Sequence, residues 1–163
     1  MTSDLVIRPA HRLDATPMAD LLNDIITLGG TTTRTAPLSA ADLWQQIGTL
    51  PRSACHVAES DGRSCGFQHI TPWSGLPPEA CDIATFVKTG CRQLGVGSAL
   101  FDATAEAARD LGYGWICAAI RADNKGGLAY YQSRGFRPYG LVEDLKLASG
   151  QVVNQVLTRF DLD

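Results

Sequence analysis

A short segment near the middle of the chain has the residue types of an anion-binding turn. Gly95 and Gly97 follow Arg92 within residues 92–98, and helical periodicity begins at Gly95. The first N–H groups of a helix have no partner inside it, and the helix dipole favours negative charge there. Glycine lets the backbone approach a phosphate because no Cβ intervenes. This turn is therefore our first candidate for a phosphate-binding site.

The spacing of this turn differs from that of two other phosphate-binding motifs. A P-loop needs Gly-Lys followed by Ser or Thr, and this turn holds no lysine. A dinucleotide-binding turn needs Gly or Ala where Leu100 stands, and an acid further on, where Trp115 and its apolar neighbours stand. A plain strand-to-helix turn without a ligand explains the glycines but not the flanking Arg92. Nucleotide hydrolysis is therefore disfavoured. A nicotinamide-dependent oxidoreductase is kept as a third alternative, behind the two functions given in the next paragraph.

The spacing Arg92-x-x-Gly95-x-Gly97 resembles the coenzyme A pyrophosphate loop of the GNAT superfamily, the acyl-CoA-dependent N-acyltransferases. A later stretch matches the same family in order and spacing: Asn124, Tyr130-Tyr131 and Gly135-Phe136. Residues 7–10, 23–26 and 120–124 resemble the phosphinothricin N-acetyltransferase-like branch. The resemblance implies transfer of an acetyl group from acetyl-CoA to a small, amino-acid-like amine by direct attack in a ternary complex. The alternative is a non-catalytic module that binds acyl-CoA as a sensor.

The resemblance also assigns roles to individual residues. It implies a base at Asp82, on the strand before the glycine turn, where the branch often has Glu. Asp82 could instead pair with a neighbouring arginine or cap its strand, with Glu79 as a weaker substitute base. The family's tyrosine corresponds to Tyr131, whose O–H would donate to the thiolate sulfur or only position it. The positions expected to contact acetyl-CoA are Thr85, Phe86, Val87, Arg92, Gln93, Leu94, Gly95, Val96, Gly97, Ser98, Asn124 and Ser133.

Three further residues are candidates for binding the acceptor, because loop residues near a cleft often decide specificity. Arg34, in the loop that follows the first helix, could pair with a substrate carboxylate or remain a solvated surface arginine. Thr33 precedes it in the same loop. Trp73 would be a lid over apolar surface or part of the core. The branch's Lys-Phe-Gly-Arg-Trp-like stretch has no counterpart at residues 147–152, so the acceptor is left open.

Composition limits the partners. The 163 residues, read as one domain over 1–163, are 45% hydrophobic and carry 14 Lys and Arg against 17 Asp and Glu, a net charge of -3. A nucleic-acid-binding protein needs a basic face, which this balance does not favour. The start of the chain has no apolar run behind a basic leader, and no stretch reaches the roughly 18 apolar residues of a membrane span. We expect a cytoplasmic protein, and family likeness suggests a homodimer.

The cysteines and histidines do not suggest a metal. Five cysteines are an odd number without C-x-x-C spacing, and the three histidines lack the i, i+4 spacing of two ligands on one helix. We therefore predict no metal site. Asp61-Gly62 is typical of a two-residue hairpin turn. Opposed positions would then sum to 123, which places Cys55 opposite Gln68 and Cys65 opposite Ala58 and disfavours a disulfide between the two cysteines.

Strands and helices must hold these residues, and their pattern predicts an α/β or α+β fold with the element order β-α-α-β-β-β-α-β-α-β-β. The family likeness further implies a mixed, mostly antiparallel central sheet flanked by helices. Asp14 is predicted to cap the first helix and Ser39 the second. The strands are expected at residues 5–8, 55–60, 64–70, 81–87, 115–120, 140–148 and 152–161, and the other two helices at residues 95–111 and 124–133.

Overall fold

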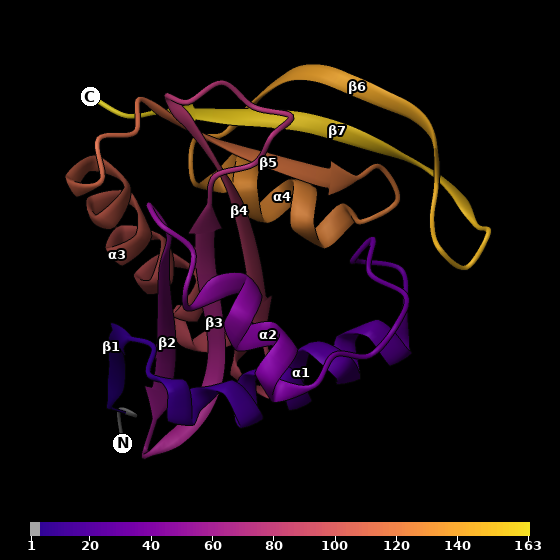
Figure 1. Cartoon of the computed structure of the whole chain (residues 1–163). Helices are drawn as coiled ribbons and strands as arrows, with labels where there is room; N and C mark the ends of the chain where they lie inside the picture. The colour runs from indigo at the N-terminus through magenta and orange to yellow at the C-terminus, as the bar shows by residue number, and fades with distance from the viewer. Residues whose placement is uncertain (1–3) are drawn as a thin grey trace.

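A single mixed sheet with helices on both faces organises the chain (Figure 1). The computed structural model describes residues 4–163, except for the side chains of residues 92–94. The seven strands lie in the order β1-β2-β3-β4-β5-β7-β6. Their bounds are β1 Leu5–Pro9, β2 Ala54–Ser60, β3 Arg63–Thr71, β4 Ala80–Val87, β5 Trp115–Arg121, β6 Arg137–Lys146 and β7 Val152–Asp161. The element order and the mixed, mostly antiparallel sheet agree with the sequence analysis.

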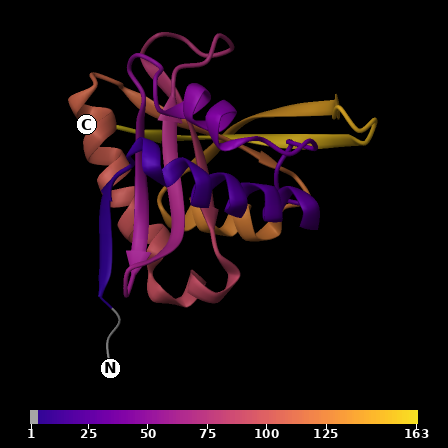
Figure 2. The same cartoon turned by 60° about the horizontal axis from the view of Figure 1, so that its bottom comes forward.

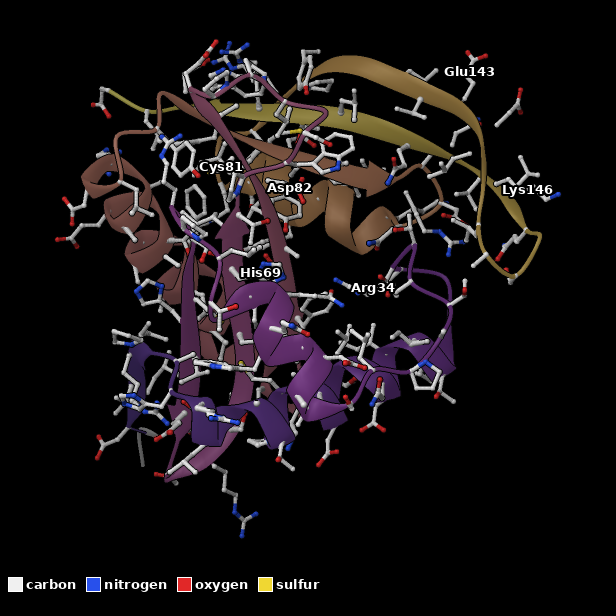
Figure 3. The ribbon with its side chains drawn as sticks, viewed as in Figure 1. Arg34, His69, Cys81, Asp82, Glu143 and Lys146 are labelled. Carbon is white, nitrogen blue, oxygen red and sulfur yellow. The ribbon has the colours of Figure 1, made fainter. Side chains whose placement is uncertain are left out.

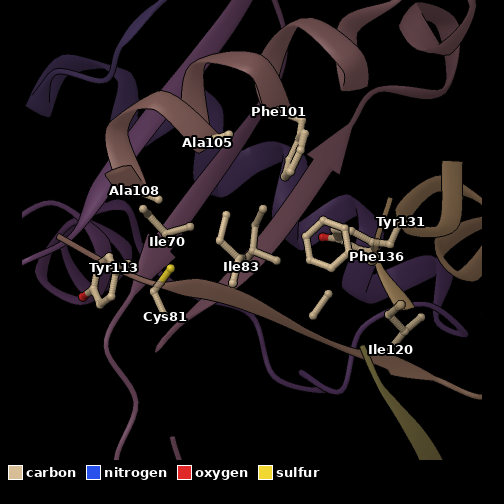
Figure 4. Close-up of a cluster of buried hydrophobic side chains, with 12 residues drawn as sticks. Ile70, Cys81, Ile83, Phe101, Ala105, Ala108, Tyr113, Ile120, Tyr131 and Phe136 are labelled. Carbon is tan, nitrogen blue, oxygen red and sulfur yellow. The ribbon is translucent and has the colours of Figure 1, made fainter. Parts of the chain in front are cut away.

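The helices divide between the two faces of the sheet (Figures 1 and 2). They are α1 Ala15–Leu28, α2 Ala40–Ile47, α3 Val96–Asp110 and α4 Lys125–Ser133, with short 3₁₀ turns at Arg12–Asp14 and Thr89–Leu94. Successive side chains of a strand point to opposite faces. Phe67 and Phe86 accordingly pack with α1 and α2, whereas Ile70 and Ile83 pack with α3 and with Tyr131 of α4 (Figure 4).

The helix ends follow the local sequence, with one exception. Ser39 caps α2 by accepting a hydrogen bond from the Asp42 N–H at 3.1 Å, and α1 ends at Gly29, whose φ of 71° suits glycine. Asp14 stands at the N-cap position of α1 but does not cap that helix. Its carboxylate instead accepts two hydrogen bonds from Arg8, at 2.8 and 2.9 Å. The Asp14 carboxylate, which the sequence pattern predicted as the cap of α1, therefore binds Arg8 of β1 instead.

The β2–β3 hairpin turns where predicted but changes register beyond its second pair. Asp61 and Gly62 have φ angles of 52° and 76°, the left-handed values that a two-residue turn requires. A bulge then shifts the pairing, so that Cys55 lies opposite His69 rather than Gln68. Ala58 lies opposite Gly66 and not opposite Cys65. The predicted register was wrong for these residues because one bulge residue moves every later pair by one position.

The only parallel pairing in the sheet is short, and it ends where the strands separate. β4 and β5 pair through Ala80–Trp115, Cys81–Ile116 and Asp82–Cys117. Residues 83–87 of β4 continue to pair with β3 on their other side, while β5 pairs with β7 along its whole length. The sheet therefore opens beyond Asp82, and the second half of β4 has one edge without a strand partner.

None of the helices in the described range 4–163 combines the length and the apolar character needed to cross a membrane.

Candidate active site

A cavity of about 1440 Å³ occupies the place where β4 and β5 separate. It lies between residues 83–87 of β4 and residues 119–121 of β5, and it extends to the segment after α1, the start of α3 and the helix α4. Ligand pockets commonly have volumes of roughly 300–1,000 Å³. This cavity is larger, so it has room for parts of two molecules at once.

The start of α3 contributes backbone groups to one end of the cavity. Gly95 has a φ of 74° and stands at the N-cap position, where a glycine has no side chain to cap the first turn. The first helical bond runs from the Ala99 N–H to the Gly95 carbonyl at 3.1 Å, so the N–H groups of residues 96–98 have no partner within the helix. Gly97 and Ser98 line the cavity. The Val96 side chain is fully buried in the core, so its contribution there is limited to its backbone.

Gly97 is required for a reason that the sequence analysis did not give. A Cβ at this position would lie 2.6 Å from Cε1 of Tyr130. The Tyr130 hydroxyl donates to the Gly97 carbonyl at 2.7 Å, which holds the ring against this turn. A side chain at position 97 would therefore push the Tyr130 ring, and with it α4, away from the turn.

Three of the predicted contacts, Arg92, Gln93 and Leu94, have side chains that lie outside the described part of the structure.

The unpaired edge of β4 forms one wall of the cavity. Thr85, Phe86 and Val87 all line it. The Phe86 ring packs against Phe67 with centroids 5.0 Å apart, so Phe86 offers the cavity mainly its backbone. An extended ligand with amide groups could add to this edge as a further strand does.

A chain of hydrogen bonds connects the α3 turn with Tyr131. The buried amide of Gln68 donates to the Tyr130 hydroxyl at 3.1 Å and to Thr85 Oγ1 at 2.8 Å. Thr85 Oγ1 and the Tyr131 hydroxyl are 2.7 Å apart, and either atom can donate. Residues of β3, β4 and α4 therefore fix the Tyr131 hydroxyl at the cavity.

The environment of Tyr131 disfavours complete transfer of its hydroxyl proton. Burial raises the pKa of the Tyr131 hydroxyl above its usual value near 10, although the bond to Thr85 opposes this change. A thiol has a reference pKa of about 8.5. Complete transfer of the Tyr131 proton to a thiolate would therefore be uphill, whereas a hydrogen bond from its O–H to sulfur carries no such cost.

Asp82 contributes a carboxyl group without a compensating charge. It lines the cavity, and no hydrogen bond or ion pair of its side chain occurs among the described residues. Burial raises its pKa to about 7. Neither the arginine partner nor the strand cap considered in the sequence analysis is found in this part of the chain. A carboxylate with a pKa near neutrality is suited to accept a proton.

Asp82 and Tyr131 approach the cavity from opposite faces of the sheet. Asp82 is registered with Thr71, two residues from the Ala84–His69 pair, on the face covered by α1 and α2. Thr85, the partner of Tyr131, points to the face covered by α3 and α4. The opening between β4 and β5 joins the two sides.

The loop between α1 and α2 closes the side of the cavity that holds Asp82. Thr33 and Arg34 line the cavity, and Arg34 Nη2 donates to Gln46 Oε1 at 3.1 Å. Among the described residues no carboxylate pairs with Arg34. Trp73 is 58% exposed and does not line this cavity, nor does the exposed Glu79.

The remaining predicted contacts differ in position. Asn124 lines the cavity, but its Oδ1 already accepts the Gly127 N–H at 2.9 Å as the cap of α4. Ser133 is exposed, lies outside the cavity lining, and donates to the Tyr130 carbonyl at 2.6 Å. The Asn124 Nδ2 group donates to the Thr31 carbonyl at 3.4 Å, so Asn124 connects the start of α4 with the segment after α1. Ser133 stabilises the end of α4.

Sequence reasoning missed four residues that the structure brings to this region. Gln68 and Tyr130 hold Tyr131 and the α3 turn, while His69 and Arg121 line the side with Asp82. A signal for Gln68 and His69 exists in the sequence, because these two residues interrupt an apolar strand, and buried polar side chains in strands commonly have a specific partner. Arg121 carries no such signal in the sequence.

Among the described residues, no group of three or more His, Cys, Asp or Glu side chains is arranged to hold a metal ion.

Comparisons with known proteins agree on one family. A model of the acetyltransferase (GNAT) family matches residues 21–136. A Bacillus subtilis (strain 168) protein, provisionally named a phosphinothricin acetyltransferase, is 24% identical over 151 residues, which cover 90% of this chain and 93% of that protein.

Solved structures share the fold at low sequence identity. An N-acetyltransferase from Staphylococcus aureus Mu50 is 20% identical with a TM-score of 0.88, and the match covers 99% of this chain and 100% of that one. A GNAT superfamily phosphinothricin acetyltransferase from Sinorhizobium meliloti, solved in complex with acetyl-CoA, is 19% identical with a TM-score of 0.86, covering 99% of this chain and 89% of that one.

Proposed function

Since the chain belongs to the GNAT family of acetyltransferases, we propose that it transfers an acetyl group from acetyl-CoA to the amine of a small, amino-acid-like acceptor by direct attack in a ternary complex. The observation that carries this proposal is the cavity between β4 and β5, which Asp82 reaches from one face of the sheet and Tyr131 from the other.

Features of the cavity fit acetyl-CoA. The free N–H groups at the start of α3 suit a diphosphate, and the unpaired edge at Thr85–Val87 suits the amides of a pantetheine arm. Gly97 leaves room for the Tyr130 ring, which holds α4 against this turn. When bound, acetyl-CoA supplies the acetyl thioester, and the residues of the chain orient it and handle the proton.

Asp82 acts as the base. An alkylammonium has a pKa near 10, so the acceptor must lose a proton before its nitrogen can attack. The Asp82 carboxylate, with a pKa of about 7, is substantially ionised at neutral pH and accepts this proton directly or through one water. The nitrogen then forms its bond to the acetyl carbon as the carbon–sulfur bond breaks and the sulfur leaves as a thiolate, and the second proton that the nitrogen loses passes to this thiolate or to solvent.

Tyr131 stabilises the departing sulfur by hydrogen bonding. Its hydroxyl is held by Thr85 at 2.7 Å, and its raised pKa keeps the proton on oxygen. A hydrogen bond to a charged group contributes roughly 1.5–3 kcal/mol. Most of the acceleration then comes from holding the two reactants together, which can supply about 7–11 kcal/mol.

Arg34 supports an acceptor that carries an anionic group. The guanidinium lines the cavity on the side of Asp82, and burial lowers its pKa. A partly buried cation without a carboxylate partner is stabilised when a ligand supplies one. An amine with a carboxylate or phosphinate provides both the nucleophile and this partner.

The test is a screen for release of CoA from acetyl-CoA with amino acids, methionine sulfoximine, phosphinothricin, polyamines and peptide N-termini. Protein-only controls are needed because five cysteines react with thiol reagents. We expect turnover with an amino-acid-like amine, and a rate that rises with pH through an apparent pKa near 7. Binding of CoA without thiol release across the panel would support the sensor function instead, and binding of NADH without CoA would contradict both.

A further inference from the structure

His69 is a buried histidine that the mechanism above does not use. It lies on β3 opposite Ala84, is only 8% exposed, and lines the cavity on the side of Asp82 (Figure 3). Its ring lies beside the packed pair Phe67 and Phe86, with centroids 6.4 and 6.5 Å away. Packing therefore fixes the orientation of the imidazole.

The nitrogen atoms of this ring have no hydrogen-bond partner among the described residues. Nδ1 is enclosed and makes no hydrogen bond to any described side chain or backbone group. Nε2 makes none either, but it is not enclosed, so it is the ring nitrogen that a ligand can reach. A ligand in the cavity would therefore meet the imidazole through Nε2.

The charge of His69 is set by burial and by Arg34. Burial and the nearby guanidinium lower the pKa of His69 to about 4. The imidazole is therefore neutral at pH 7, with one N–H to donate. It stands beside a cation that lacks a carboxylate partner among the described residues. A neutral donor next to a guanidinium suits a negatively charged oxygen and opposes a second ammonium group.

We propose that His69 is a specificity-determining residue that, together with Arg34, binds the anionic group of the acceptor through Nε2. This inference rests on the proposed acetyl transfer and adds the recognition of the acceptor's second functional group. The amine would lie toward Asp82, which is registered with Thr71, two residues along β3 from His69. The site would thus favour zwitterionic amines over diamines.

The experiment compares L-amino acids with their carboxamides, which differ in the anionic group and keep the side chain. The ratio of kcat/KM for acid to kcat/KM for amide is measured for the wild type, His69→Phe, His69→Gln and Arg34→Gln at one pH. We expect the wild type to transfer acetyl groups to the acid. His69→Phe keeps a ring beside Phe67 and Phe86 and should lower the ratio by about ten-fold or more, as should Arg34→Gln. His69→Gln, whose amide can replace Nε2 as a donor, should restore part of the loss.

His56→Phe is the matched control. His56 lies on the neighbouring strand β2, is partly buried, and also has an enclosed Nδ1 without a partner. It does not line the cavity between β4 and β5. This variant should keep the wild-type ratio, which separates loss of a ligand contact from a general effect of removing a buried histidine.

An unchanged ratio in His69→Phe would overturn the inference while leaving the proposed function standing, whether the two kcat/KM values keep their wild-type level or fall by the same factor. If the wild type binds CoA but turns over no acceptor, the proposed function fails. NMR then tests the inference separately. The imidazole resonances of His69 are assigned as those that are missing from the spectrum of His69→Phe. Resonances that shift with amino acids and not with their amides would support an anion site, and resonances that shift with neither would exclude it.

Discussion

The Asp82 carboxyl group lies in surroundings that offer it no partner among the described residues. Burial raises its pKa from 3.8 to about 7, and the cavity lies open on its side of the sheet. A structural carboxylate would be paired, and its pKa would be lowered, as that of Asp14 is by Arg8. The chain therefore contains one acid whose charge stabilises the fold and another whose charge destabilises it.

Replacing Asp82 with Asn should stabilise the protein in a pH-dependent way. The pKa of the folded state lies above the unfolded value of about 3.9, so the wild type loses stability as pH rises from about 4 and the loss is complete above about 7. Asp82→Asn should therefore melt at a higher temperature than the wild type at pH 8, and the difference should vanish near pH 3.5. Thermal melting across this range measures it. The exposed Glu79→Gln serves as control, and a lower melting temperature for Asp82→Asn at pH 8 would contradict the unpaired carboxylate.

The two adjacent tyrosines of α4 should have separable effects. Tyr131→Phe removes the hydroxyl next to Thr85 and should lower kcat by roughly 10- to 100-fold, with little change in CoA affinity, because the lost hydrogen bond forms mainly to the developing thiolate. Tyr130→Phe removes the bond to the Gly97 carbonyl and should weaken CoA binding more than it lowers kcat. Steady-state kinetics together with calorimetric CoA titration distinguish the two. The reverse pattern would make Tyr131 a binding residue.

At the scale of elements, hydrogen bonds between distant segments assemble the site. Arg121 at the end of β5 is 4% exposed, holds Asp123 through two bonds of 3.0 and 2.7 Å, and donates to the Thr32 carbonyl at 3.1 Å. Asn23 of α1 fixes the far end of the same loop by bonding both the N–H and the carbonyl of Leu38. The loop that carries Arg34 is thus tied to the sheet and to its own helix.

Arg121→Lys should disturb the loop that carries Arg34, where we propose that the acceptor binds. It should have less effect on the proposed acetyl-CoA site. Lysine keeps the charge but cannot bond Asp123 through two nitrogens and reach Thr32 as well. We expect KM for the acceptor to rise about ten-fold, with a smaller change in KM for acetyl-CoA. The exposed Arg109, which pairs with Asp163 at 3.1 Å, offers Arg109→Lys as the control without effect. Equal rises in both KM values would show that Arg121 supports the whole cavity rather than the loop.

The hydrogen bonds between distant segments show which features of the structure the sequence could not predict. Strands, helices and their order follow from local periodicity, and the glycine turn follows from spacing. The contact between Arg121 and Thr32 joins residues 89 positions apart, and nothing in either local pattern indicates it. The bulge at Cys65 likewise depends on how β3 meets its neighbours, so the local turn at Asp61-Gly62 could not fix the pairing of Cys55.

At the scale of the whole molecule, one break in the sheet gives the two reactants separate approaches. The pairing of β4 with β5 stops at Asp82, and the cavity passes from the α3 and α4 side to the α1 and α2 side. The donor and the acceptor can then be bound at the same time. An intermediate acyl carrier is unnecessary in such an arrangement.

The initial-velocity pattern should therefore be sequential. Cys117, the residue paired with Asp82, is 2% exposed, does not line the cavity, and has its pKa raised by burial, so it is a poor candidate for an acyl carrier. Double-reciprocal plots at several acceptor concentrations should intersect, and acetyl-CoA alone should release no stoichiometric burst of CoA. Cys117→Ser should keep most of the turnover. Parallel lines together with an acetylated protein detected by mass spectrometry would instead require a covalent step. The cavity at the break in the sheet would then bind the donor and the acceptor one after the other.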